Sequence, residues 1–200
     1  MGPSNVMALP LDLALFLFLG LFSPGPNVIM LFSSGARFGF RATLPHLFGV
    51  VVGAGILGFL IGFGMGSIIF ALPILEWGFR IFAFLWILWL AFRIYQSADK
   101  TIDATSDRPM RFIEAVLFQA VNPKFWSVAL GGTAYLIGTI PIVQAITLSG
   151  MVMVINVFVC LFWAWFGHGL APFLNKGAVR KWFLRIMAVL LAMSGLLVLT

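Results

Sequence analysis

The sequence predicts an all-α polytopic membrane protein with six transmembrane helices, arranged as two inverted three-helix repeats in which helices one and four are broken. Three observations support this: an apolar composition, six long apolar runs, and two proline motifs at matched positions in the two halves. Hydrophobic residues make up 62% of the chain and charged residues only 9%. A soluble domain carries about a quarter charged residues. We therefore expect lipid, and not water, to cover most of the surface.

The six apolar runs are each long enough for a transmembrane helix, because crossing ~30 Å of hydrocarbon takes about 20 residues. They cover residues 9–32, 47–72, 77–95, 112–138, 142–166 and 179–199. The polar segment 96–111 separates the third run from the fourth and is interpreted as a cytoplasmic linker. The sequence thus predicts a single transmembrane transporter domain, 1–200, with a first repeat at 1–95 and a second at 112–200.

Basic residues gather at one side of the predicted helices. Ten of the 12 lysine and arginine residues lie there, namely Arg37, Arg41, Arg93, Lys100, Arg108, Arg111, Lys176, Arg180, Lys181 and Arg185. Loops rich in lysine and arginine stay in the cytoplasm. We therefore expect a multi-pass inner-membrane protein with both termini outside, and the net charge of +6 indicates topology and not nucleic-acid binding.

Two motifs interrupt the first and fourth runs. Ser23-Pro24-Gly25-Pro26-Asn27 lies inside the first run, and Asn122-Pro123-Lys124 lies near the centre of the fourth. Proline removes a backbone donor and clashes with the preceding turn, so each motif should kink or unwind its helix. Transporters built from inverted repeats bind substrate at the midplane between discontinuous helices. A proline alone often only kinks a membrane helix, but the matched pair with asparagine in both motifs favours a binding site.

Lys124 lies roughly 18 Å into the fourth run when the distance is counted from Phe112 at 1.5 Å per residue. An ammonium group at that depth costs roughly 2.5–3.5 kcal/mol. It either snorkels or caps carbonyls freed around Pro123, or it has a function, and the depth favours a function. Together with half-helix N-termini it would bind the carboxylate of an amino acid. Carbonyl groups at the breaks, with Asn27 and Asn122, would accept from the ammonium.

The candidate substrate-binding residues are Pro24, Gly25, Pro26, Asn27, Asn122, Pro123, Lys124 and Asn156. For Asn156 a hydrogen bond to a neighbouring helix and a substrate contact remain alternatives. None of the six acidic residues falls at the midplane of a run, so we expect a small neutral substrate, no metal and no cofactor. His46 and His168 are candidates for proton coupling because histidine titrates near neutrality. A packing or interfacial role is the more common one for such histidines.

The same motifs resemble those of the LysE/RhtB-type amino-acid exporter family. Residues 23–27 and 35–39 resemble the opening of that family, and residues 119–124 and 163–168 resemble patterns of its fourth and fifth helices. Residues 39–46 resemble the branch that includes cysteine and O-acetylserine exporters. The resemblance implies a bacterial antiporter, driven by the proton gradient, that exports cysteine/O-acetylserine-like or threonine/homoserine-like compounds.

One departure from the family concerns the second helix, where many members carry an aspartate after a glycine. Here Gly53 is followed by Ala54, so a coupling role for that acid has no counterpart. Other functions stay open: export of metal ions or toxic compounds, and a non-transporting scaffold. A membrane enzyme is disfavoured by the shortage of buried titratable groups. Six short helices enclose little space, so a homodimer is a further expectation.

Overall fold

The computed structural model describes residues 4–23, 25–65, 73–98, 108–174 and 177–196. Within these ranges the chain forms helices and no strand, which confirms the all-α class. The helices are α1 (Ser4–Phe22), α2 (Pro26–Phe38), α3 (Phe40–Gly62), α5 (Pro73–Ser97), α6 (Phe112–Ala120), α7 (Pro123–Thr133), the short 3-10 helix η1 (Ala134–Leu136), α8 (Pro141–Leu174) and α9 (Gly177–Leu196).

Both predicted breaks are present. The first apolar run is divided into α1 and α2, and the fourth is divided into α6 and α7. In the described part of the chain, α3 and α8 are long and apolar enough to cross a membrane, and α1 with α2 adds a third span if the pair is one helix bent by 56°. The two halves of the fourth run are each too short to qualify alone, since α6 has nine residues and α7 eleven. The predicted count of six spans therefore stays a prediction.

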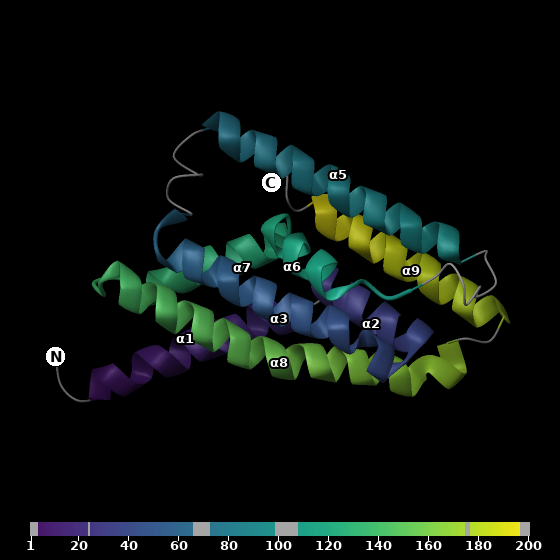
Figure 1. Cartoon of the computed structure of the whole chain (residues 1–200), viewed down its shortest axis with the longest axis horizontal. Helices are drawn as coiled ribbons and strands as arrows, with labels where there is room; N and C mark the ends of the chain where they lie inside the picture. Colours follow the sequence, from purple (N-terminus) through teal and green to yellow (C-terminus); the bar gives the residue numbers. More distant parts are fainter. Residues whose placement is uncertain (1–3, 24, 66–72, 99–107, 175–176, 197–200) are drawn as a thin grey trace.

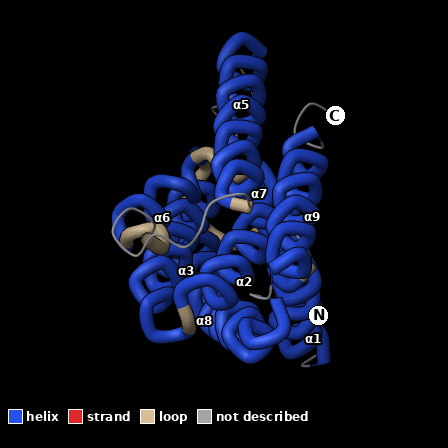
Figure 2. The backbone as a smooth tube through the Cα atoms, turned by 90° about the vertical axis from the view of Figure 1, so that its right-hand side faces the viewer, coloured by secondary structure: helices blue, strands red, loops and turns tan. Residues whose placement is uncertain are grey.

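The helices pack in two groups, which Figures 1 and 2 show from perpendicular directions. In the larger group α3 lies along α8, α2 packs against α8, and α6 packs against α3. Helices α1 and α7 contact each other and complete this group. In the smaller group α5 and α9 lie side by side, and α9 also contacts α2.

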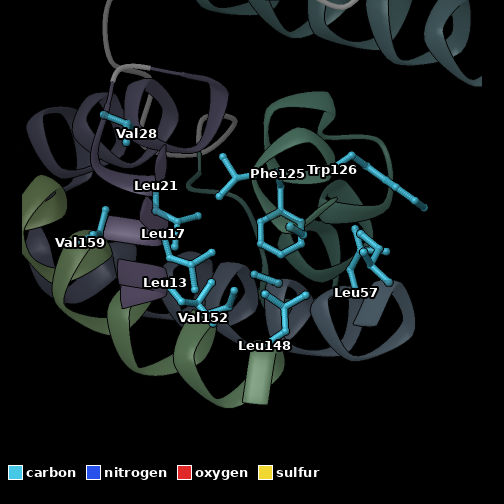
Figure 3. Packing of buried hydrophobic residues seen from close by; sticks show 14 residues of the cluster. Leu13, Leu17, Leu21, Val28, Leu57, Phe125, Trp126, Leu148, Val152 and Val159 are labelled. Carbon is cyan, nitrogen blue, oxygen red and sulfur yellow. The ribbon is translucent and has the colours of Figure 1, made fainter. Parts of the chain in front are cut away.

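The largest cluster of buried apolar side chains lies where α1 and α7 meet α3 and α8 (Figure 3). Phe125 from α7 is fully buried in this cluster. Around it are leucine and valine side chains that include Leu13, Leu17, Leu57, Leu148 and Val152. Many other large apolar side chains are exposed, such as Leu11 at 69% and Phe158 at 66%. A surface of this kind suits contact with lipid.

Helices α2 and α8 approach each other closely at two glycines. A Cβ atom on Gly35 would collide with the backbone oxygen of Ala164, and one on Gly167 would collide with the backbone oxygen of Phe32. Small residues allow membrane helices to approach at backbone distance. This contact fixes α2, and with it the start of α2 at the first break, against α8.

Substitution of Gly167→Ala tests this contact. The added methyl group overpacks the interface between α2 and α8, so we expect the free energy of unfolding to fall by about 1–3 kcal/mol. Thermal unfolding of the purified protein in detergent measures the change. Gly150→Ala on the same helix is the matched control, because a Cβ atom there meets nothing within 4 Å. Equal stability of the two variants would contradict the close approach.

Candidate functional site

Each break is also the start of a new helix. Pro26 is the first residue of α2 and Pro123 is the first residue of α7. Proline suits this position because the N–H that it lacks would have no partner within the helix. Gly25 precedes α2 with an extended backbone, and Asn122 caps α7 by accepting a hydrogen bond from the N–H of Phe125 at 3.4 Å. The two motifs thus build the same local structure, a cap residue followed by proline.

Lys124 joins the two breaks. It is the second residue of α7, and its ammonium group donates a hydrogen bond to the carbonyl oxygen of Ser23, which follows α1. Its side chain lies against Gly25, where a Cβ atom would overlap the Lys124 stem. Of the two interpretations drawn from the sequence, carbonyl capping is therefore observed. The capped carbonyl belongs to the first break and not to the turn around Pro123.

A reciprocal pair of amides also connects the broken helices. The Asn27 Nδ2 atom donates to Gln119 Oε1 at 2.8 Å, and Gln119 Nε2 donates to Asn27 Oδ1 at 3.1 Å. Gln119 is fully buried in α6 and also donates to the Ala115 carbonyl at 3.1 Å. Asn122 Nδ2 donates to Gln119 Oε1 at 3.4 Å. Gln119 is thus a site residue that the motif reading left out, although a buried amide in a membrane helix is itself a signal of function.

Asn156 brings α8 into the site. Its side chain is buried, and its Oδ1 atom accepts from the Cys160 thiol at 3.7 Å. Its Nδ2 atom has no hydrogen-bond partner among the residues that the structure describes. A buried donor without a partner costs about 1–3 kcal/mol. A ligand with an acceptor atom beside Asn156 would therefore gain a hydrogen bond from this Nδ2 atom.

These polar groups line one cavity. Gly25, Asn27, Asn122, Lys124 and Asn156 all contribute to its wall, which is otherwise mostly apolar. The cavity volume is about 20 Å³, which is room for about one water molecule. In this conformation the cavity is therefore too small for a ligand of the size of an amino acid.

Two of the three predicted prolines do not line this cavity in the structure. Pro26 and Pro123 start their helices and lie outside its wall, and Pro24 lies outside the described residues. Their role in the described structure is to set where α2 and α7 begin.

The site has a positive character. The N-termini of α2 and α7 meet at the breaks, and a helix N-terminus carries a partial positive charge. Lys124 adds a full charge, and among the described residues no carboxylate side chain lines the cavity. Such an arrangement can bind a carboxylate group. In the described ranges no three His, Cys, Asp or Glu side chains gather as a metal site would require.

The two histidines lie away from the breaks. His46 is buried in α3 and lines a different cavity of about 710 Å³. His168 is exposed near the end of α8 and lines neither cavity. The larger cavity was not expected from the sequence, because residues of α2, α3, α5 and α6 meet there only after folding.

The amide pair of Asn27 and Gln119 can be tested with a double-mutant cycle of Asn27→Ala and Gln119→Ala. Hydrogen bonds between side chains of membrane helices contribute about 0.6–2 kcal/mol, so we expect a coupling energy in that range. The measurement is the free energy of unfolding of the four proteins in detergent. Strict additivity of the two single effects would show that the two amides do not interact.

Comparison with known proteins supports one assignment. The family model "LysE type translocator" matches residues 18–200, which include both breaks. The cysteine/O-acetylserine efflux proteins of Escherichia coli K12, O1:K1 and O6:K15:H31 strain 536 are each 31% identical to this chain over 154 residues, covering 73% of this chain and 75% of theirs. No solved structure matches the chain. The chain belongs to the LysE-type translocator family.

Proposed function

We propose that the protein is a secondary transporter of the bacterial inner membrane that exports small neutral amino acids or related metabolites from the cytoplasm. Membership of a translocator family supports transport, and relatives named cysteine/O-acetylserine efflux proteins make those two compounds the first candidates. The observation that carries the proposal is the position of Lys124 between the two helix breaks, in one cavity with the unpartnered amide nitrogen of Asn156.

The proposed architecture is a pair of inverted repeats, 1–95 and 112–200, joined by a cytoplasmic linker at 96–111. Two features of the described helices support it. Helices at equivalent places in the two halves pair with each other, α3 with α8 and α5 with α9. The two breaks also share their local design, since α2 and α7 both begin with proline. The placement of basic residues supports cytoplasmic loops and both termini outside.

In the proposed mechanism the substrate replaces contacts that close the empty site. The carboxylate binds Lys124, the N-terminus of α7 and the amide nitrogen of Asn156. The Ser23 carbonyl then no longer binds the lysine and accepts a hydrogen bond from the substrate ammonium. The carboxylate and the ammonium of the zwitterion thus replace the hydrogen bond between Lys124 and Ser23. Separation of the amides of Asn27 and Gln119 opens the breaks. Movement of the half-helices exposes the site to one side of the membrane at a time.

We further propose that export is driven by the proton gradient, with His46 as the candidate proton carrier because it alone of the two histidines lines a cavity. A homodimer is proposed as well. Its test is the oligomeric state of the purified protein in detergent.

Substitution of Lys124→Ala should lower the export rate about tenfold or more, because a hydrogen bond to a charged group contributes about 1.5–3 kcal/mol. Export of radiolabelled cysteine from overproducing cells measures the effect, and the amount of protein in the membrane must match the wild type. Lys181→Ala is the matched control, since that lysine lines neither cavity. Unchanged export in Lys124→Ala cells would refute the proposed site.

The charge of the substrate provides a second test. Cysteine, serine and O-acetylserine should compete with radiolabelled cysteine for export, whereas lysine and arginine should not. The physical reason is that a second cationic group would lie beside Lys124, in a cavity where no described residue offers a carboxylate to pair with it. Competition is measured as inhibition of radiolabel efflux. Stronger inhibition by lysine than by serine would overturn the assignment to neutral substrates.

A further inference from the structure

The larger cavity lies between the two groups of helices and has a volume of about 710 Å³. Its wall comes from α2, α3, α5 and α6 and from the residues just before α6. A volume of this size is within the range of small-molecule binding sites. Its polar lining residues include Ser33, His46, Arg37, Arg93 and Glu114.

Two buried polar side chains in this wall have no hydrogen-bond partner among the described residues. The Ser33 hydroxyl and both ring nitrogens of His46 make no hydrogen bond to any residue that the structure describes. Ser33 is 4% exposed and His46 is 2% exposed. By contrast, the neighbouring Ser34 shares a hydrogen bond with Thr43 at 2.9 Å. Because unpaired buried polar groups are costly, the wall favours a ligand that forms hydrogen bonds.

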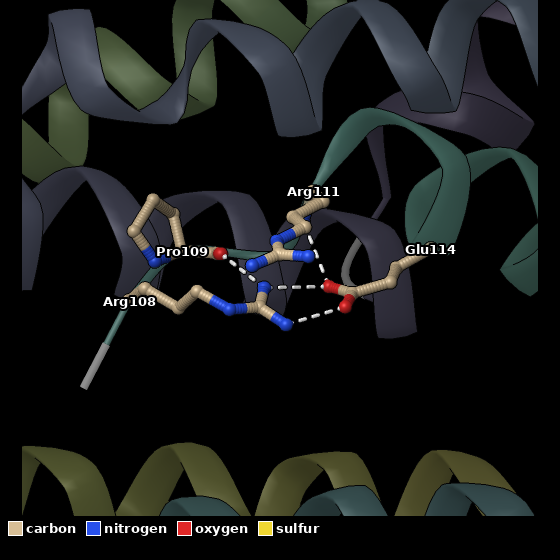
Figure 4. Close-up of polar contacts among 4 residues, drawn as sticks. All are labelled: Arg108, Pro109, Arg111 and Glu114. Atoms are coloured by element: carbon tan, nitrogen blue, oxygen red, sulfur yellow. Dashed lines mark hydrogen bonds and ion pairs between the residues drawn. The ribbon is translucent and has the colours of Figure 1, made fainter. Parts of the chain in front are cut away.

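The charges around the cavity favour an anionic group. Arg37, Arg93 and Arg108 line the wall, and Glu114 is the one carboxylate among the lining residues. Arg108 binds both oxygens of Glu114, at 2.5 and 2.8 Å, and the backbone N–H of Arg111 donates to the same carboxylate (Figure 4). This hydrogen bonding raises the pKa of Arg108. The charges of Arg108 and Glu114 thus offset each other. With three arginines and one glutamate, the described lining residues carry a net positive charge.

Part of the wall of this cavity lies close in sequence to the two breaks. Met30 and Phe118 line the cavity and belong to one buried cluster. Met30 lies one helical turn after Asn27, and Phe118 directly precedes Gln119. The amide pair of Asn27 and Gln119 therefore lies on the same two helices, within one turn, as two residues of the cavity wall.

We propose that the larger cavity is a loading site, which binds the carboxylate-bearing substrate on the basic, cytoplasmic side before it passes to the two breaks. Ser33 and His46 hydrogen-bond the substrate there, and the arginines attract its carboxylate. This inference rests on the proposed function, because it takes export of an amino acid as its starting point. An anionic lipid headgroup would meet the exposed Arg93 and Arg108 but would leave the buried Ser33 and His46 without partners.

The test is equilibrium binding of radiolabelled cysteine to the purified protein in nanodiscs, together with export kinetics from overproducing cells. Ser33→Ala should weaken binding and raise KM roughly five- to thirtyfold, with Vmax within about twofold of the wild type, and His46→Leu should weaken binding by the same factor. His46→Gln, which hydrogen-bonds but does not titrate, should restore most of the affinity. Ser149→Ala is the matched control, because its hydroxyl donates to the Gly55 carbonyl and lines neither cavity.

The outcomes separate the loading site from the proposed function. If Ser33→Ala and His46→Leu bind cysteine as the wild type does, the loading site is wrong while export stands. If both histidine variants bind normally but lose Vmax, His46 acts in coupling and the loading site is again wrong. A wild type that binds cysteine but does not export it refutes the proposed function alone, and the variants still decide the loading site by binding. A wild type that binds no neutral amino acid refutes both.

Discussion

Satisfaction of the backbone groups at two broken helices is the constraint on which the rest of this structure depends. Inside a bilayer no bulk water hydrogen-bonds a free carbonyl or N–H group, so protein atoms must do so. Two side chains from the second half of the chain meet this need. Asn122 satisfies an N–H at the start of α7, and Lys124 satisfies the Ser23 carbonyl after α1. The lysine does so across the breaks, which makes the two half-helices depend on each other.

That dependence explains why the closed site is small. With the Lys124 and Asn27 contacts in place, the breaks are held together and the cavity has room for about one water molecule. The same contacts are those that a zwitterion can replace. A carboxylate competes for the ammonium of Lys124, and an ammonium competes for the carbonyl that the lysine releases. In the proposed mechanism, closure without substrate and binding of substrate therefore use one set of groups. A leak is then disfavoured, because an empty open site leaves these groups unpaired.

The sequence predicts the breaks well because proline acts locally. Pro26 and Pro123 exclude a continuous helix whatever surrounds them, and the structure starts α2 and α7 at these residues. The partners of the polar side chains are set by packing over long stretches of chain and do not follow from spacing. The pairing of Asn27 with Gln119 and the orientation of Asn156 toward the cavity are of this kind. The difference in burial between His46 and His168 is also set by packing. Each histidine lies beside the end of an apolar run, so the sequence alone does not tell which of the two is buried.

No carboxylate lines the small cavity among the described residues, and this affects how strongly Lys124 is held at Ser23. A carboxylate near Lys124 would pair with the ammonium and hold it away from Ser23, so a substrate would have to displace a full ion pair. A neutral carbonyl is a weaker partner for the ammonium than a carboxylate, because a carboxylate carries a full negative charge and adds a Coulomb attraction between two opposite charges. A substrate carboxylate therefore offers the lysine a better partner than it has in the closed state. In the proposed mechanism, the difference between these two partners is a driving force for opening the breaks when a zwitterion arrives. A cationic side chain on the substrate would reduce this driving force by repelling the same lysine.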